Sequence, residues 1–234
     1  MTRRKAAAIL AAVGVLTAGC GAGKAEDEAR GGGGKSKSPL APQKLAADTG
    51  KRYKQARIPH LPGMTCDEGD GGFRYGDGLD MGVFGDDGLK LQESDSEEKS
   101  FQASCFGAKR IVLTKGSVPA TVPHLMGETK LYKRIADPKA SLKKSFRYTM
   151  DLIGSYGRSM VGKPRTFTTK ELVIECQKNV ADNFPMTTCM WANYGALGVV
   201  DFYPPSGTHV PVAKAAERTR KFAASTLRTH EAGH

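Results

Sequence analysis

The sequence lacks the short motifs that identify the common classes of enzyme and metal site. None of its five cysteines forms a C-x-x-C pair, so the usual zinc and thiol-redox sites are not expected. There is no G-x-S-x-G nucleophile motif, and neither Ser-Asp-Asn nor Lys-Thr-Gly follows the S-x-x-K match at Ser141 and Lys144. No helix-turn-helix or RNA-binding motif accompanies the basic charge, so nucleic acid is not an expected partner.

The apolar N-terminal run is too short to cross a membrane. Ala6–Leu16 contains eleven residues without a charge, whereas a spanning helix needs about 20. The run follows Arg3, Arg4 and Lys5 and precedes small residues, which is typical of a cleaved export signal. We therefore expect residues 1–19 to be a signal peptide.

Leu16-Thr17-Ala18-Gly19-Cys20 resembles the lipobox of bacterial lipoproteins, although Thr17 stands where a large aliphatic residue is usual. The resemblance implies that Cys20 is lipidated, becomes the new N-terminus and anchors the protein to the extracytoplasmic face of the cell membrane. A diacylglyceryl group would make this anchoring durable, because two acyl chains bind a protein stably to a membrane, whereas one acyl chain binds it only marginally. The alternative is an ordinary cleaved signal with a cysteine nearby.

Four cysteines remain after Cys20, an even number in an oxidising compartment. They are Cys66, Cys105, Cys176 and Cys189, for which three pairings are possible, with free thiols as the alternative. We expect structural disulfides. If the strands around residues 174 and 191 pair symmetrically about their connecting loop, Cys176 faces Cys189 and Ile174 faces Trp191, which favours that bridge.

The chain divides by composition into a tether, a domain and a tail. Residues 20–50 are rich in Gly, Ser and mixed charge and predict a flexible tether. A short basic helix is expected over Gln43–Arg57, where the tether meets the domain. Residues 51–229 predict one α+β domain stabilised by disulfides, with an antiparallel sheet packed by two or three helices. Residues 230–234 are expected to be a frayed tail.

Apolar periodicity locates the elements of the domain. Strands are expected at Leu79–Phe84, Leu172–Ile174 and Cys189–Phe202, with a loop from Lys178 to Met186, and a further strand or a hairpin is expected over Phe101–Leu113. Helices are expected near 138–161 and 210–228, where apolar residues recur every three or four positions. Asp137-Pro138 and Pro211 are typical helix starts.

The strand Cys189-Met190-Trp191-Ala192, followed by Gly198-Val199-Val200, resembles a group of uncharacterised actinobacterial lipoproteins with a Cys-x-Trp-Ala strand. The resemblance covers the helix–strand–strand–helix run of the second half of the chain. It implies a small exported α+β domain and no particular activity.

Basic residues exceed acidic ones, 35 against 24, and the two kinds are unevenly distributed. Cys66–Glu98 holds eleven acids but only Arg74 and Lys90, whereas Ala108–Lys178 holds fifteen Lys and Arg and five acids. Two interpretations remain open. The segments form solvated faces that attract each other within the fold, or the basic face approaches anionic lipid head groups or an anionic wall polymer.

Two segments contain groups that could bind a metal, and neither fits a known site. Glycine-spaced aspartates suit a calcium loop, but an EF-hand beginning at Asp67 would have Gly69 and Gly71 at ligand positions. The aspartates are Asp67, Asp70, Asp77, Asp80, Asp86 and Asp87. His230 and His234 complete an H-E-x-x-H match, but Gly233 interrupts the turn and no third ligand follows. We expect no metal and no cofactor.

These observations favour a non-enzymatic binding or interaction module at the cell surface. The enzymatic alternative is a wall-directed serine hydrolase that uses Ser141 and Lys144. A third possibility is a small-molecule carrier with a pocket near Trp191.

Overall fold

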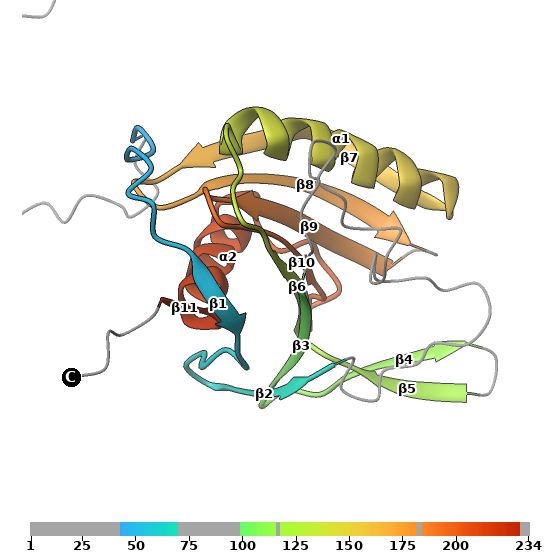
Figure 1. Cartoon of the computed structure of the whole chain (residues 1–234). Coiled ribbons are helices and arrows are strands. Elements are labelled where there is room, and N and C mark those ends of the chain that lie inside the picture. Colours follow the sequence, from blue (N-terminus) through green and yellow to red (C-terminus); the bar gives the residue numbers. More distant parts are fainter. Residues whose placement is uncertain (1–42, 70–98, 116–117, 182–183, 230–234) are drawn as a thin grey trace, which may run out of the picture. The chain divides into compact units, whose positions relative to one another are not determined.

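A computed structural model describes residues 43–69, 99–115, 118–181 and 184–229, which centre on a seven-stranded sheet (Figure 1). In spatial order the strands are β2 (Met64–Glu68), β3 (Lys99–Gly107), β6 (Leu125–Leu131), β10 (Ala196–Phe202), β9 (Phe184–Ala192), β8 (Val173–Ala181) and β7 (Arg158–Thr168). Every strand pairs antiparallel with its neighbours, as the sequence predicts.

Two helices cover opposite faces of this sheet. They are α1 (Pro138–Ser155) and α2 (Val212–Thr226). Because side chains alternate along a strand, Val173 of β8 packs in one cluster with Leu142 of α1, and Ile174 packs in another with Phe222 of α2. The α+β class is thus confirmed for the described residues. No helix among them is long and apolar enough to cross a membrane.

Helix α1 begins where the sequence predicts and ends earlier. Asp137 caps it, because its Oδ1 accepts the backbone N–H groups of Lys139 and Ala140 at 3.0 Å each. The end expected near residue 161 is wrong. Gly157 has a φ of 92°, which turns the chain out of the helix, and Arg158 then begins β7.

The arm, which we define as residues 43–52, has no regular secondary structure and lies along the end of the large sheet (Figure 1). The backbone N–H groups of Gln43 and Ala46 donate to Thr168 and Lys170 at 3.2 and 3.0 Å. The short helix expected over Gln43–Arg57 is therefore wrong, because these N–H groups bond to a strand end instead of to a preceding helical turn.

A strand that follows the arm pairs with a strand at the C-terminal end of the described residues, and the two form a second, two-stranded sheet. Its strands are β1 (Tyr53–Ala56) and β11 (Leu227–Thr229), and Arg57 extends the ladder by donating to Thr226. Helix α2 therefore ends at Thr226 and not near 228 as predicted. A further hairpin joins β4 (Ile111–Lys115) and β5 (Val118–Val122). The strand or hairpin predicted over Phe101–Leu113 is instead divided between β3 and β4, each of which pairs with other strands.

Two disulfides tie neighbouring strands of the large sheet. Cys66–Cys105 joins β2 to β3, and Cys176–Cys189 joins β8 to β9. The predicted register of the second pair is confirmed, since Cys176 lies opposite Cys189 and Ile174 opposite Trp191.

The segment predicted as one strand over Cys189–Phe202 is two strands joined by a tight turn. Asn193 makes that turn: its Oδ1 accepts the backbone N–H groups of Gly195 and Ala196, both at 2.9 Å. The loop expected from Lys178 to Met186 is shorter than predicted, because β8 continues to Ala181 and β9 begins at Phe184. The strand expected at Leu79–Phe84 lies outside the described residues.

Candidate functional site

The structure does not bring the hydrolase pair together at an accessible surface. Ser141 lies on the sheet-facing side of α1 and is 3% exposed, whereas Lys144 lies on the exposed side. A wall polymer could not reach a nucleophile in that position. The geometry therefore gives the hydrolase alternative no support.

Trp191, around which the carrier alternative placed a pocket, is a core residue. Its side chain is 0% exposed and belongs to the cluster between the sheet and α2. The indole lies against the backbone of Gly198, so the space beside it is filled. The burial of Trp191 is what is usual for a lone strand tryptophan beside a disulfide, and it gives the carrier alternative no support.

Several predicted site residues lie outside the described part of the chain. They are Cys20, Asp70, Asp77, Asp80, Asp86, Asp87, His230 and His234. Asp67 is described and is an exposed residue of β2. Within the described ranges, no three His, Cys, Asp or Glu side chains gather closely enough to hold a metal ion.

The described surface has a small pocket where the arm meets the sheet end. Arm residues 45–49 and Lys51 form one wall together with Tyr53 of β1, and the turns 170–171 and 193–195 form the others. Its volume is about 180 Å³, below the roughly 300–1,000 Å³ of pockets for drug-sized ligands. We call it the arm pocket; it has room for one small group.

A fixed hydrogen-bond chain places the phenol of Tyr53 at the arm pocket. Because Asn193 Oδ1 already accepts two backbone N–H groups of its turn, the Nδ2 end of the amide faces away from the turn. Asn193 Nδ2 donates to Tyr53 Oη at 2.9 Å. The phenol oxygen therefore accepts one bond and still has its own hydrogen to donate. Burial raises the pKa of Tyr53, and the nearby Glu171 carboxylate adds to this, so the phenol stays protonated at neutral pH.

The charges around the arm pocket favour an anion. The Asp48 carboxylate is neutralised by Arg52, whose two terminal nitrogens each donate to it at 2.8 Å. This guanidinium, helped by the Gly50 N–H, lowers the pKa of Asp48 to about 2. Lys51 and Lys170 are exposed, and neither forms an ion pair within the described ranges.

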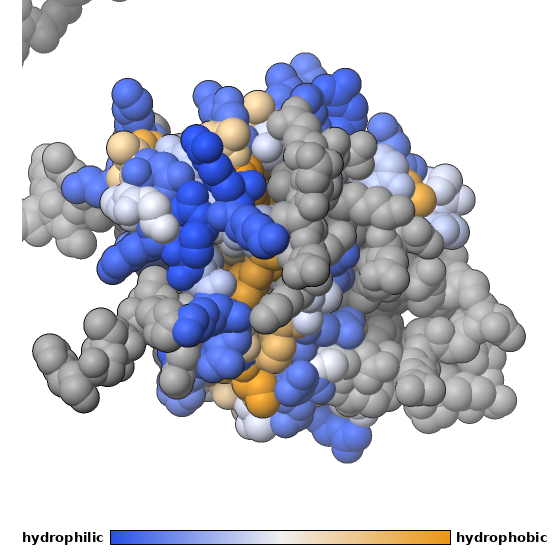
Figure 2. Space-filling model, in the orientation of Figure 1, coloured by the Kyte–Doolittle hydropathy of each residue, from blue (hydrophilic) through white to orange (hydrophobic). Residues whose placement is uncertain are grey.

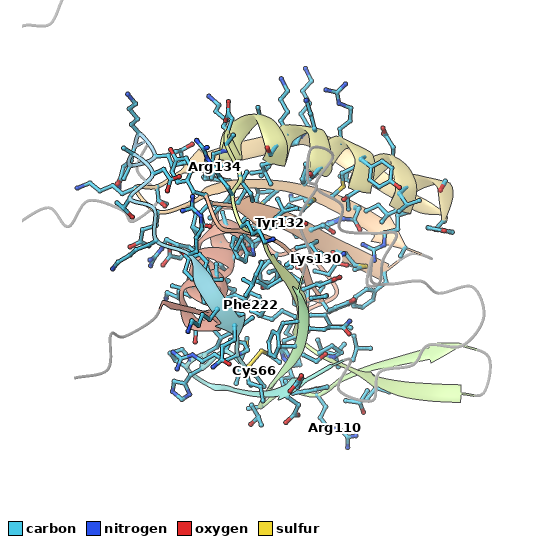
Figure 3. All side chains as sticks on the ribbon, viewed as in Figure 1. Cys66, Arg110, Lys130, Tyr132, Arg134 and Phe222 are labelled. Carbon is cyan, nitrogen blue, oxygen red and sulfur yellow. A yellow bond between two sulfur atoms is a disulfide. The ribbon has the colours of Figure 1, made fainter. Side chains whose placement is uncertain are left out.

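Helix α1 carries a second concentration of positive charge. Its exposed side presents Lys139, Lys143, Lys144 and Arg147 against one acid, Asp151; we call this the cationic face of α1. In Figure 3 nitrogen-tipped side chains point from α1 away from the sheet, and Arg134 lies near the start of the helix. Figure 2 shows strongly hydrophilic side chains gathered where the arm meets the segment that enters α1.

A buried polar cluster below α1 was not anticipated from the sequence. Arg158 Nη2 donates to Asp201 Oδ2 at 3.1 Å, with side chains 1% and 0% exposed. Thr188 donates to the other carboxylate oxygen of Asp201, and Asn179 Nδ2 donates to Thr188 at 2.8 Å. The cluster links β7, β8, β9 and β10 and has no opening among the described residues, so we assign it to structure.

In comparisons with protein families, with curated proteins and with solved structures, no match to this chain was found.

Proposed function

We propose that this protein is an exported lipoprotein, anchored through Cys20 after loss of residues 1–19, that acts as a non-enzymatic binding module. Its cationic face of α1 docks on the anionic lipid surface that holds the anchor. The single observation that carries this proposal is the placement of charge on α1.

That placement works against the helix itself. Lys139 lies in the first turn of α1, where the positive end of the helix dipole disfavours a cation by roughly 0.3–1 kcal/mol. The spacing of Lys139, Lys143 and Arg147 also creates two like-charge pairs at i,i+4, each unfavourable by about 0.2–0.5 kcal/mol. Lys143 lies within electrostatic reach of the half-buried Glu175 of β8, whereas Lys139 and Arg147 form no ion pair with a described residue. A polyanionic partner is the best explanation for the remaining charge of this face.

The position of the arm supports a membrane as that partner. The arm is hydrogen-bonded to the sheet end at Gln43 and Ala46. The composition of residues 21–42 predicts a flexible linker with a root-mean-square span of about 25 Å. A lipid at Cys20 would therefore keep the domain close to the bilayer, where each basic residue contributes about 1 kcal/mol of attraction to anionic lipid. The four cations of the face would contribute about 4 kcal/mol.

Vesicle sedimentation tests this proposal with the mature chain carrying Cys20→Ser, so that no lipid holds it. We expect binding to vesicles of phosphatidylglycerol and phosphatidylcholine, and none to phosphatidylcholine alone. The triple variant Lys139→Glu, Lys143→Glu, Arg147→Glu should bind at least about 100-fold more weakly.

A control variant with the same change in net charge shows whether binding depends on the cationic face of α1 or only on the total charge of the protein. Lys109→Glu, Lys214→Glu, Lys221→Glu alters exposed residues away from α1 and should bind nearly as well as the parent. Equal losses in both triple variants would reject the face. Retention by a purified anionic wall polymer without binding to anionic vesicles would reject lipid as the partner.

A further inference from the structure

We infer that the arm pocket is a binding site for a phosphate group carried on a short polyol, such as glycerol phosphate. The group would be held by the Tyr53 phenol and the ammonium groups of Lys51 and Lys170. This site is separate from the cationic face of α1, and the inference holds whether or not that face docks on lipid.

The phenol of Tyr53 gives the pocket a donor that is fixed in place. Asn193 is 6% exposed, and three hydrogen bonds hold its amide: two that it accepts from its own turn and one that it donates to Tyr53 Oη. Asn193 is thus a positioning residue for the phenol, whose hydrogen has no partner among the described residues. A ligand group that only accepts hydrogen bonds, such as a dianionic phosphate, suits this phenol.

The ammonium groups make the pocket select for negative charge. Lys51 and Lys170 both line it, and neither pairs with a carboxylate in the described ranges. Of the two acids in the lining, Asp48 is held by Arg52 through two hydrogen bonds. Glu171 also lines the pocket, and Arg220, which lies within its electrostatic reach, is already paired with Glu217. With Asp48 paired, the two ammonium groups still outnumber this one carboxylate.

Size and donor number narrow the ligand to a small phosphate ester. A volume of about 180 Å³ excludes a nucleotide or a large cofactor. A phosphate monoester has three terminal oxygens and close to two negative charges at neutral pH, which matches one phenol and two ammonium donors. A carboxylate has one charge and two oxygens. Leu45, Ala46 and Ala47 supply an apolar wall for the carbon chain of a short polyol.

Titration of the isotopically labelled mature chain, with Cys20→Ser, tests the site by NMR. The probes are glycerol 3-phosphate, glycerate and glycerol, and the readout is the side-chain amide signal of Asn193. Glycerol 3-phosphate should bind at least about tenfold more tightly than glycerate, and glycerol should cause no shift. Equal shifts with all three, or none with glycerol 3-phosphate, would overturn the inference.

Variants test the named donors. Tyr53→Phe keeps the ring and removes the hydroxyl, so affinity should fall about tenfold, the usual loss for a hydrogen bond to a charged group. Lys51→Gln with Lys170→Gln should weaken binding further. The control pair Lys214→Gln with Lys221→Gln, on α2, should leave affinity unchanged. If Tyr53→Phe retains its melting temperature and the parental affinity, the phenol is not a ligand.

Two further experiments distinguish this site from the cationic face of α1 and identify the source of the phosphate. The α1 triple variant should bind glycerol 3-phosphate as the parent does, because the site lies outside that face. In the same variant, an Asn193 shift with nanodiscs of phosphatidic acid, whose head group is a phosphate monoester, as well as with glycerol 3-phosphate would assign the site to lipid head groups. A shift with glycerol 3-phosphate alone would assign it to the free ester.

Discussion

Gly198 of β10 lies directly opposite Trp191 of β9, and the indole rests on the glycine backbone. A Cβ placed on Gly198 would stand 2.5 Å from the indole ring, closer than real Cβ contacts allow. The aromatic ring thus covers a position where the strand has no side chain of its own. The same relationship recurs on this face of the sheet, where Phe222 of α2 covers Gly127 of β6 (Figure 3).

Gly198→Ala should destabilise the domain by about 1–3 kcal/mol, because Trp191 is fully buried and cannot move aside without disturbing the core. Urea unfolding, followed by the fluorescence of this single tryptophan, measures the change. Gly154→Ala is the matched control. Gly154 lies in α1 with open space around it, so alanine should stabilise by about 0.5–1 kcal/mol. A neutral Gly198→Ala would show that the core is looser there than described.

Removing Arg158 alone should be far more damaging than removing the whole ion pair. Arg158→Met leaves the buried Asp201 carboxylate with Thr188 as its remaining described partner, and we expect a loss of about 3–5 kcal/mol. Arg158→Met with Asp201→Leu should recover much of that loss, since no buried charge is left. The two unfolding midpoints give the comparison, and a double variant as unstable as the single one would contradict this account.

The sequence predicted the second half of the domain well because its signals are local. The N-cap of α1 and the alternation around Cys176 and Cys189 depend on neighbouring residues, and both were confirmed. The turn at Asn193 was missed because the uncharged stretch on either side of it reads as one strand. Asn193-Tyr194-Gly195 is nevertheless a recognisable turn signal.

The candidate site could not be predicted, because it is assembled from three segments far apart in the chain. Lys51, Lys170 and Asn193 meet only through the docking of the arm on the sheet end. The arm was expected to be a tether, since its composition has too little apolar surface to indicate a packed element. Its hydrogen bonds to Thr168 and Lys170 are long-range contacts that no local pattern encodes.

The pKa of Asp48 should be measurably low, with a titration midpoint near 2 in place of the ordinary 3.8. A carboxyl whose pKa is lower in the folded state stabilises that state above its ordinary pKa, and the effect is lost as pH falls through the folded value. Docking of the arm should therefore weaken between about pH 4 and pH 2. Carbon-13 NMR of the Asp48 carboxyl follows the titration directly.

Arg52→Gln is the matched variant for that titration. It removes the guanidinium that is the first cause of the shift and leaves the Gly50 N–H in place. The midpoint should rise toward 3.8 without reaching it. A midpoint that does not move would mean that Arg52 does not pair with Asp48 in solution.

The proposed anchor makes a prediction about the intact protein in its own membrane. Mass spectrometry of the membrane fraction should show a chain that lacks residues 1–19 and carries a diacylglyceryl adduct at Cys20. Because Cys66–Cys105 and Cys176–Cys189 are both oxidised, the polypeptide should also be four hydrogens lighter than its reduced form. Cys20→Ser should abolish the lipid adduct but leave both disulfides in place. A full-length chain recovered from the cytosol with reduced thiols would remove the basis for both the anchor and the membrane-facing role of α1.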